Sequence, residues 1–229
     1  MVTRALILAG GTASGRAELD AAWPGWDGAI DLVIAADAGA LLARPLGLRL
    51  DLIVGDADSL GEVRLAEFAG AGIAIERAPT DKDASDTELA LLAAATRGAA
   101  ELAVLGAFGG RLDHALANVW ILAHPVLARR TAALLDGRTR LRLLTAGSGP
   151  PTGLDLDGRA GNLVTLLPFD GPALGVTTSG LRWPLTDATL PAGFSRGLSN
   201  EVVARSGEAP RVELGDGRLL IIETTLIGS

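Results

Sequence analysis

The chain has 229 residues, of which 48% are hydrophobic and 21% charged, so it can bury a sizeable core and is not expected to be disordered. Its net charge of −7, with no basic stripe or tail, argues against nucleic-acid binding, and the lack of cysteine excludes disulfides and thiolate metal sites. The first apolar run is too short for a signal peptide or a membrane span, so we expect a soluble, cytoplasmic protein with no membrane partner.

Short apolar runs alternate with helix-like segments over the first 145 residues. We expect strands at 5–9, 32–36, 52–54, 73–75, 102–105 and 132–135. We expect helices at 38–43, 62–69, 85–96 and 113–123. Continuous apolar strands separated by helices predict a parallel sheet covered on both faces, which places this part of the chain in the α/β class.

The pattern changes near residue 145. Glycine and proline mark a linker or wide turn at 146–151, including Ser148. Short strand-like runs follow at 163–167, 176–178, 202–205, 211–214 and 219–223. Asp216-Gly217 predicts a hairpin turn between the last two runs. We therefore expect a parallel-sheet α/β domain at 1–145, followed by a small all-β sandwich or barrel at 146–229.

Aspartates follow several of the apolar runs in the first part, at the points where the expected strands end. In an open α/β sheet, ligands bind beyond the carboxyl ends of the strands, so these side chains would share one edge. Carboxylates crowded there repel one another, and a divalent cation relieves the repulsion. Magnesium binds carboxylates together with water and phosphate oxygens, so we predict a magnesium-nucleotide site. The set is Asp37, Asp56, Asp58, Asp81, Asp83 and Asp86.

Each aspartate taken alone also has an ordinary structural interpretation. Asp37 could cap the helix that follows it, and Asp83 could do the same with Asp86 as its acidic partner three residues on. Gly55-Asp56 could be a plain turn. Because capping aspartates are common, the structural interpretation is favoured at any single position, and the magnesium prediction depends on the whole set.

Residues 109–114 carry a second phosphate signal. Two glycines, Gly109 and Gly110, let the backbone approach a phosphate, and a helix that begins near Leu112 offers free N–H groups. The guanidinium of Arg111 can bind two phosphate oxygens at once. A strand-to-helix turn with a surface arginine explains the same segment equally well.

Three other features of the first part carry weaker signals. Lys82 is the only lysine and follows an aspartate rather than a glycine, so the chain has no P-loop. The glycine-rich segment 10–15 is a weak signal of phosphate or ribose contact. His114 fits either a base or nucleotide contact or a structural group, and His124, beside a proline, is expected to be structural.

In the second part, Trp183 and the pair Ser199-Asn200 are candidate ligand contacts. The chain has only four Trp and four Phe and no Tyr, so a Trp in a turn-rich β segment is a candidate for stacking on a flat cationic ring. A core or interface tryptophan is the ordinary alternative. Ser199 and Asn200 could simply be turn residues.

The order of these motifs resembles that of the thiamine pyrophosphokinase family, over about residues 6–222. Single motifs are weak, but six in order across two domains are specific. They are ADAGA at 36–40, GDADS at 55–59, DKDASDTE at 81–88, GGRLDH at 109–114, GLRW at 180–183 and SNE at 199–201. Ala38 stands where the family often has glycine, and Ser85 where it often has threonine, but both changes leave the aspartates in place.

The resemblance implies an ATP- and magnesium-binding catalytic α/β domain at 1–145, a thiamine-binding β-sandwich domain at 146–229, and a homodimer with active sites between subunits. It implies magnesium and ATP-phosphate binding by Asp37, Asp56, Asp58, Asp83 and Asp86. The expected nucleotide contacts are Asp37, Gly39, Ser59, Lys82, Gly110, Arg111, Asp113 and His114. The expected thiamine contacts are Trp183, Ser199 and Asn200.

The predicted reaction is transfer of pyrophosphate from ATP to the hydroxyl of thiamine, with AMP as the leaving group. Positioning and charge neutralisation would supply most of the catalysis. The expected catalytic residues are Asp58, Asp83, Asp86 and Arg111, and either Asp83 or Asp86 would accept the hydroxyl proton. A pyrophosphokinase for another small alcohol, such as a pterin, and a non-catalytic nucleotide or thiamine sensor are the alternatives.

Overall fold

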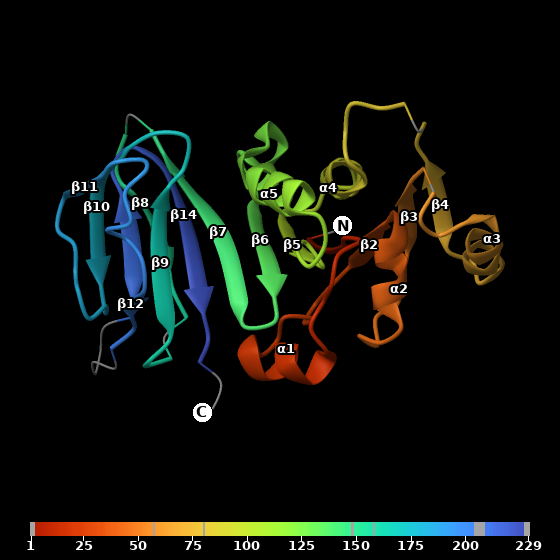
Figure 1. The fold of residues 1–229 in the computed structure, drawn as a ribbon, viewed down its shortest axis with the longest axis horizontal. Helices are drawn as coiled ribbons and strands as arrows, with labels where there is room; N and C mark the ends of the chain where they lie inside the picture. Colours follow the sequence, from red (N-terminus) through yellow and green to blue (C-terminus); the bar gives the residue numbers. More distant parts are fainter. Residues whose placement is uncertain are drawn as a thin grey trace. The chain divides into compact units, whose positions relative to one another are not determined.

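The computed structural model describes residues 3–56, 58–79, 81–147, 149–157, 159–203 and 209–226. The chain divides into two compact units, with the boundary between Gly137 and Arg138 (Figure 1). The sequence pattern had placed this boundary near residue 145. Strand β7 (Thr139–Ala146) accounts for the difference, because it pairs along its whole length with a strand of the second unit. Ala57 and Ser148, which belong to predicted motifs, lie outside the described residues.

The first unit contains a six-stranded parallel sheet in the order β6-β5-β1-β2-β3-β4. All six strands predicted for the first part of the chain are present, and the parallel arrangement is confirmed. Their bounds are Arg4–Leu8 (β1), Leu32–Ala36 (β2), Leu52–Gly55 (β3), Ala74–Arg77 (β4), Glu101–Leu105 (β5) and Thr131–Asp136 (β6).

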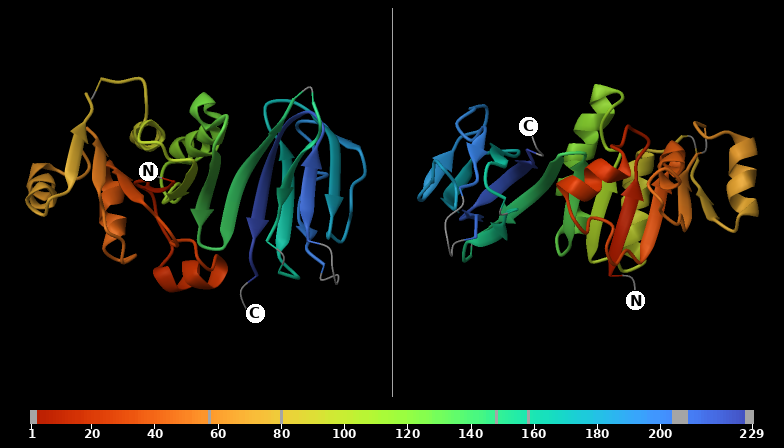
Figure 2. Two further views of the ribbon diagram at one scale, coloured as in Figure 1. Left: turned by 180° about the vertical axis from the view of Figure 1, so that it is seen from behind. Right: turned by 90° about the horizontal axis from the view of Figure 1, so that it is seen from below.

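The centre of this sheet is covered on both faces. Successive side chains of a strand point to opposite faces, and Leu6, Ile7 and Leu8 of β1 are each at most 1% exposed. Helix α4 packs across β1, β2 and β3, while α3 lies beside the edge strand β4 (Figures 1 and 2). The helical segments are Arg16–Ala22 (α1), Asp37–Gly39 (η1), Ala40–Ala43 (α2), Glu62–Gly70 (α3), Asp86–Thr96 (α4), Leu112–Trp120 (α5), Ile121–Ala123 (η2) and Pro125–Leu127 (η3).

The second unit contains two antiparallel sheets that share one core. One sheet has the order β12-β9-β14-β7 and the other β11-β10-β13-β8. Val164, Ile221, Val176 and Val212 come from both sheets and belong to one buried cluster, as expected for a sandwich. The bounds are Thr152–Asp155 (β8), Leu163–Pro168 (β9), Ala173–Ser179 (β10), Ala188–Leu190 (β11), Asn200–Glu201 (β12), Arg211–Leu214 (β13) and Gly217–Thr224 (β14).

The hairpin predicted at Asp216-Gly217 is wrong. Strand β13 pairs with β10 and β8, whereas β14 pairs with β7 and β9, so the turn carries the chain from one sheet to the other. A strand was also predicted at 202–205, but the chain pairs earlier, at β12, and Val202 forms only an isolated bridge. Residues 204 and 205 lie outside the described part.

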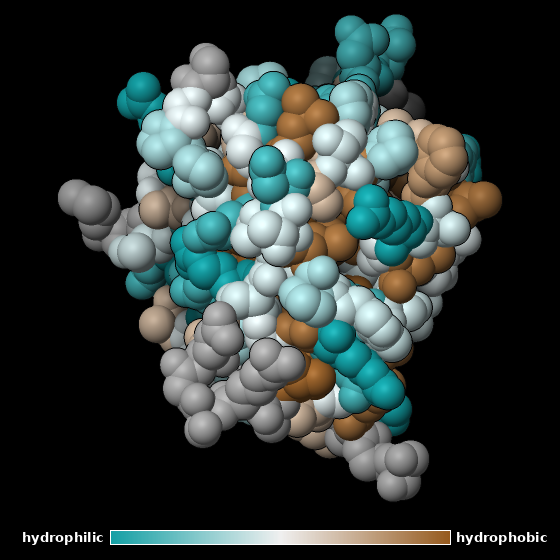
Figure 3. All heavy atoms as spheres, turned by 90° about the vertical axis from the view of Figure 1, so that its left-hand side faces the viewer, coloured by the Kyte–Doolittle hydropathy of each residue, from teal (hydrophilic) through white to brown (hydrophobic). Residues whose placement is uncertain are grey.

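One face of the molecule mixes hydrophobic and hydrophilic side chains. On the face at the left of Figure 1, hydrophobic residues lie among hydrophilic ones rather than in one continuous patch (Figure 3). None of the helices in the described part of the chain has the length and apolar character needed to cross a lipid bilayer.

Candidate active site

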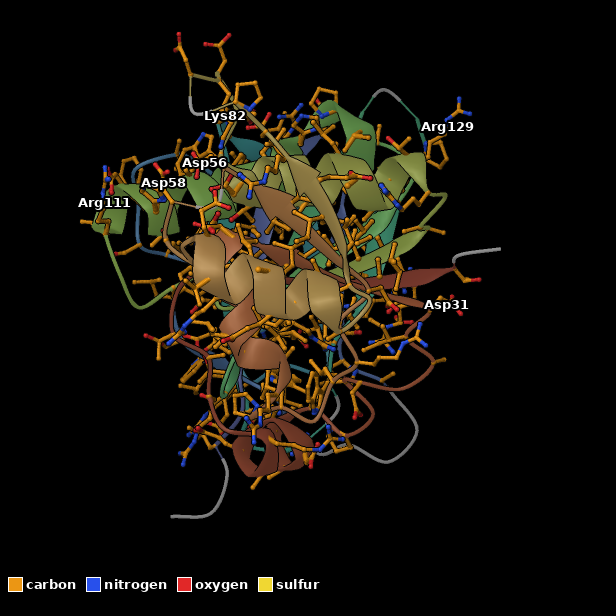
Figure 4. The ribbon with its side chains drawn as sticks, turned by 90° about the vertical axis from the view of Figure 1, so that its right-hand side faces the viewer. Asp31, Asp56, Asp58, Lys82, Arg111 and Arg129 are labelled. Carbon is orange, nitrogen blue, oxygen red and sulfur yellow. The ribbon has the colours of Figure 1, made fainter. Side chains whose placement is uncertain are left out.

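The parallel sheet places the aspartate motifs of the first unit at the carboxyl ends of its strands. Asp56 directly follows β3, and Lys82 precedes α4 in the connection from β4. Asp56, Asp58, Lys82 and Arg111 gather at one edge of this unit, whereas Asp31 and Arg129, which precede β2 and β6, lie at the opposite edge (Figure 4). The site therefore lies where ligands of open α/β sheets bind.

Three carboxylates meet at this edge. One oxygen each from Asp37, Asp56 and Asp86 lies within 4.8 Å of the other two. Gly55 makes room for them, since a Cβ there would lie 3.0 Å from Asp86 Oδ1 and 3.2 Å from the Cβ of Asp37. Its φ of +149° also lies in the range that favours glycine. The end of β3 is therefore shaped by the carboxylates on either side of it.

Asp37 is not a helix cap. Its side chain makes no capping hydrogen bond to the turn that it begins, and Oδ2 instead accepts a hydrogen bond from Ser59 N at 3.1 Å. The residue is only 6% exposed, and its Oδ1 is buried without a hydrogen-bond partner. Its φ of +43° is a left-handed conformation, which aspartate tolerates better than most residues. An unpaired buried carboxylate oxygen is costly, so this atom is suited to a cation.

Lys82 is inserted between the other two carboxylates. Its Nζ lies 2.9 Å from Asp56 Oδ2 and 2.8 Å from Asp86 Oδ1, and its side chain is 14% exposed. The hydrogen bond from Lys82 lowers the pKa of Asp56, and the N–H of Asp58 donates a second bond to that carboxylate. Burial lowers the pKa of Lys82, but the contacts with Asp86 and Asp56 outweigh this and leave it above its ordinary value.

Asp58 and Asp83 lie outside the group of three. Both are exposed, and neither belongs to the cluster found among the described residues. Asp83 is also not the cap of α4, because the N-cap is Ser85, whose Oγ accepts a hydrogen bond from Glu88 N at 3.2 Å. Of the five aspartates predicted to bind the metal, the structure thus brings three together.

A cavity of about 300 Å³ opens beside the carboxylates. It is lined by the side chains Asp37, Asp56, Lys82 and Asp86, by Gly110 and Arg111 of the loop that precedes α5, and by His114 of the first turn of α5. The guanidinium of Arg111 binds the carboxylate of Asp113 at 3.1 and 2.5 Å, and this pairing lowers the pKa of Asp113 to about 2. Arg111 is exposed, so it can exchange this partner for an anionic ligand without unfolding any element.

The loop before α5 is fixed by residues that the sequence pattern did not identify. Thr12 N donates to Phe108 O at 2.7 Å, and Thr12 Oγ1 donates to Gly109 O at 3.1 Å. The buried Asn118 donates from Nδ2 to Ala107 O at 2.8 Å. The glycine-rich segment 10–15 thus supports this loop. The only feature of the sequence that could have identified Asn118 as a residue that holds this loop is its polar side chain at a buried position of a helix.

Gly39 has a packing role in the structure. A Cβ at this position would lie 1.9 Å from the carbonyl oxygen of Leu8, so only glycine lets the turn η1 lie against β1. Gly110 differs, because a Cβ there would meet nothing within 4 Å.

In the second unit, Asn200 holds the backbone of Trp183. Its Oδ1 accepts from Trp183 N at 3.1 Å, and its Nδ2 donates to Trp183 O at 2.7 Å. Trp183 is 58% exposed and therefore not a core residue, and the guanidinium of Arg182 lies 5.1 Å from its ring centroid. Ser199, also exposed, has a φ of +55° and donates from its N to Thr165 Oγ1. The three residues predicted to contact thiamine thus lie on two neighbouring segments.

Both units match the models of known protein families. Residues 26–134 match the family model of the thiamin pyrophosphokinase catalytic domain, and residues 153–217 match that of the thiamin pyrophosphokinase vitamin B1 binding domain. The thiamine pyrophosphokinase of Bacillus subtilis is 25% identical over 195 residues, which cover 85% of this chain and 87% of the relative.

Two solved structures have the same fold. The crystal structure of a thiamine pyrophosphokinase from Bacillus subtilis has a TM-score of 0.80 at 24% identity, over 98% of this chain and 100% of that one. A thiamin pyrophosphokinase family protein from Enterococcus faecalis has a TM-score of 0.76 at 26% identity, with the same coverage of both chains. With both family models matched in order over most of its length, the chain belongs to the thiamine pyrophosphokinase family.

Proposed function

We propose that the protein transfers the pyrophosphate group of ATP to the hydroxyl of thiamine, giving thiamine diphosphate and AMP. The observation that carries this proposal is the group of Asp37, Asp56 and Asp86 beside a cavity lined by Arg111, in a chain of this family. Other pyrophosphate acceptors are less well supported, since the second unit matches the thiamine-binding model, and a purely sensory role is less well supported, since the first unit matches the catalytic-domain model.

Magnesium is the cofactor that these residues fit. Their ligand atoms are carboxylate oxygens, which a hard divalent cation prefers, and Asp37 Oδ1 lacks any hydrogen-bond partner. Asp37, Asp56 and Asp86 would hold the ion, and Asp58 and Asp83 lie near enough in sequence to join them once nucleotide is bound. A bound Mg²⁺ would supply positive charge to the phosphate oxygens of ATP.

The phosphates would be bound by the segment that leads into α5. Gly110 leaves its backbone open to a ligand, and the N-cap residue Arg111 makes no side-chain capping bond to the first N–H groups of α5. The N–H of His114 donates to Asp113 Oδ1 and would exchange this partner for an anion. Arg111 would exchange Asp113 for phosphate oxygens, which it can bind through two N–H groups. Ser59, Lys82, Asp113 and His114 complete the proposed nucleotide contacts, while Gly39 acts through the backbone.

The transfer itself requires little covalent chemistry from the protein. The thiamine oxygen forms a bond to the β-phosphorus while the bond from this phosphorus to the oxygen of the α-phosphate breaks, and AMP leaves with that electron pair. The hydroxyl proton passes to a carboxylate, for which Asp83 and Asp86 are the candidates. Arg111 would neutralise charge that builds up on the phosphoryl oxygens.

Thiamine would be recognised by the second unit. The exposed ring of Trp183 offers a face to the cationic thiazolium ring of thiamine, and Arg182 now lies over that ring. Ser199 and Asn200 lie beside it. We propose these residues as the thiamine contacts, with Asn200 acting through the backbone of Trp183 that it binds.

We further propose that the protein is a homodimer. Helix α5 exposes Leu112, Leu116 and Trp120 at fractions of 73, 50 and 58%, and their spacing of four residues places them on one side of the helix. Light scattering coupled to gel filtration should give twice the chain mass, and Leu116→Glu should give a monomer. Val63→Glu, which adds the same charge at an exposed position of α3, should leave the dimer intact.

Mixing two inactive variants tests whether the active sites are shared between subunits. If residues from two chains complete each site, unfolding and refolding a mixture of Asp86→Asn with Asn200→Ala should restore roughly a quarter of wild-type activity. Sites that are complete within one chain would give no recovery.

The decisive experiment is an assay of the purified protein with thiamine, ATP and Mg²⁺, in which AMP and thiamine diphosphate are separated by chromatography. Equal amounts of both products, lost on chelation, are expected. AMP formed with a pterin alcohol but not with thiamine would favour the other acceptor. ATP binding without AMP formation would favour the sensor.

A further inference from the structure

Lys82 occupies the position in the carboxylate group where a metal cation would be expected. Its ammonium contacts Asp56 Oδ2 and Asp86 Oδ1 at 2.9 and 2.8 Å, and all three side chains are less than a third exposed. The third carboxylate, Asp37, has one oxygen within 4.8 Å of the other two, and its Oδ1 is buried without a hydrogen-bond partner. The single ammonium of Lys82 therefore forms ion pairs with two of the three acidic side chains.

An ammonium and Mg²⁺ cannot share these oxygens. Mg²⁺ binds carboxylate oxygens at about 2.0–2.1 Å, so an ion bound to Asp56 and Asp86 would stand within a few ångströms of Nζ. Two cations at that distance repel strongly in partly buried surroundings. The lysine stem is a flexible chain of four carbons, so its head can move away while the backbone before α4 stays in place.

We infer that Lys82 holds Asp56 and Asp86 together in the metal-free protein and is displaced when Mg²⁺ binds. The inference rests on the proposed magnesium site, which it deepens. In the absence of metal the ammonium prevents the crowded carboxylates from repelling one another, and so keeps the ligands positioned. Lys82 is thus a positioning residue whose charge competes with the metal.

Calorimetric titration with Mn²⁺, without nucleotide, tests the competition. Lys82→Met keeps the length of the side chain and removes its charge, so Mn²⁺ should bind about tenfold more tightly than in the wild type. Arg77→Met is the matched control, because it also removes one positive charge. Arg77 ends β4 and pairs with Glu62, not with the carboxylate group. Its Mn²⁺ affinity should equal that of the wild type.

The displacement can be observed directly, because Lys82 is the only lysine of the chain. Labelling with ¹³C-lysine gives a single side-chain Cε signal in an NMR spectrum. Adding Mg²⁺ should shift this signal towards that of a solvated lysine, in the wild type and in Arg77→Met. In Asp86→Asn, which lacks one partner of the ammonium, Mg²⁺ should leave the signal almost unchanged.

Three results would overturn the inference. The first is Mn²⁺ binding by Lys82→Met that is as strong as, or weaker than, that of the wild type. The second is a lysine signal that does not respond to Mg²⁺ although the metal binds. The third is the absence of Mn²⁺ binding by both the wild type and Lys82→Met at millimolar concentration. Each is separable from the proposed function, because wild-type formation of AMP and thiamine diphosphate is measured independently. If the wild type forms AMP and thiamine diphosphate and any of these three results is found, the proposed reaction is retained and only the proposed role of Lys82 is rejected.

Discussion

Asp37, Asp56 and Asp86 differ from Asp58 and Asp83 in their surroundings, and this difference predicts two kinds of variant. Asp86→Asn removes a clustered ligand, so Mn²⁺ affinity without nucleotide should fall at least about a hundredfold and turnover with it. Asp58→Asn and Asp83→Asn change exposed side chains outside the group, so they should retain Mn²⁺ binding without nucleotide and nevertheless lose turnover. Calorimetry and the AMP assay give the two readouts. Equal loss of Mn²⁺ affinity in all three variants would contradict the distinction.

Asn200 has a separate expected role, because both ends of its amide bind the backbone of Trp183. Asn200→Asp keeps the acceptor and loses the donor. The KM for thiamine should rise about tenfold while the KM for ATP stays unchanged, as expected for the loss of one hydrogen bond that orients a contact residue. An altered KM for ATP would place Asn200 in a different role. Glu201→Gln, at the next position, serves as the control.

At the residue scale the sequence predicted the three aspartates that gather together with two, Asp58 and Asp83, that do not, and it did not predict how the side chains would be partnered. The positions of Asp37, Asp56 and Asp86 followed from strand ends, since parallel strands deliver their next residues to one edge. The insertion of Lys82 between two carboxylates and the burial of Asp37 depend on side-chain packing across three segments. Such packing between distant segments cannot be predicted from the local sequence.

The loop between β5 and α5 gives a prediction at the scale of an element. Gly109 has a φ of +84°, and a Cβ there would lie 2.4 Å from Thr12 Oγ1, whereas Gly110 is open. Gly109→Ala should therefore lower both stability and ATP affinity. Gly110→Ala should leave the thermal midpoint unchanged and weaken ATP binding only, because its methyl group would stand where a phosphate approaches. Scanning calorimetry and nucleotide titration separate the two effects, and unaltered ATP binding in Gly110→Ala would remove this segment from the phosphate site.

Strands β7 and β14 contain a buried ion cluster that predicts acid sensitivity. Glu223, 1% exposed, accepts bonds from Arg140 and Arg142 and from the N–H of Asp157. Burial raises the pKa of Glu223, but the Arg140 bonds and the Arg142 charge outweigh it and hold the pKa below 4.5. A depressed carboxyl pKa contributes stability that is present above 4.5 and lost as the pH falls through the folded-state pKa.

Glu223→Gln should therefore lower the free energy of unfolding by about 3 kcal/mol at pH 7 and remove this part of the acid dependence. Urea unfolding at pH 7 and at pH 4 measures both effects. Glu62→Gln is the control, because the ion pair of Glu62 with Arg77 is exposed and should contribute little. Identical pH dependence in the wild type and Glu223→Gln would refute the assignment.

The elements of the two units were not equally predictable. The parallel strands at the centre of the first unit could be predicted because buried parallel strands are continuous apolar runs. The edge strand β4 is mostly exposed and has the sequence AIER, so its apolar run is short. In the second unit β7, β8 and β11 were missed, and β12 lies before the run predicted at 202–205. Strand β7 has the sequence TRLRLLTA, in which arginines alternate with leucines, and its arginines are paired with Glu223 across the sheet. Pairing choices such as that of β13 and β14 are long-range and cannot be read from a turn motif alone.

For the whole molecule, Mg²⁺ binding should appear as added stability. A ligand that binds only the folded state stabilises it by about 2.7 kcal/mol at a hundred times its dissociation constant. The midpoint temperature of thermal unfolding of the wild type should therefore rise when Mg²⁺ is added and fall back to its original value on chelation. Asp86→Asn should show neither shift. A Mg²⁺ effect of equal size in that variant would mean that the metal acts elsewhere on this acidic chain.

The division of the chain at Gly137 has a consequence for how the protein is made. Every strand pair of the parallel sheet, and all three clustered carboxylates, come from residues before that boundary. During synthesis the amino-terminal part emerges first, and domains generally fold as units in that order. The nascent chain can thus complete its cation site while the sandwich is still being translated. Metal binding at that stage would stabilise the newly folded first unit against aggregation.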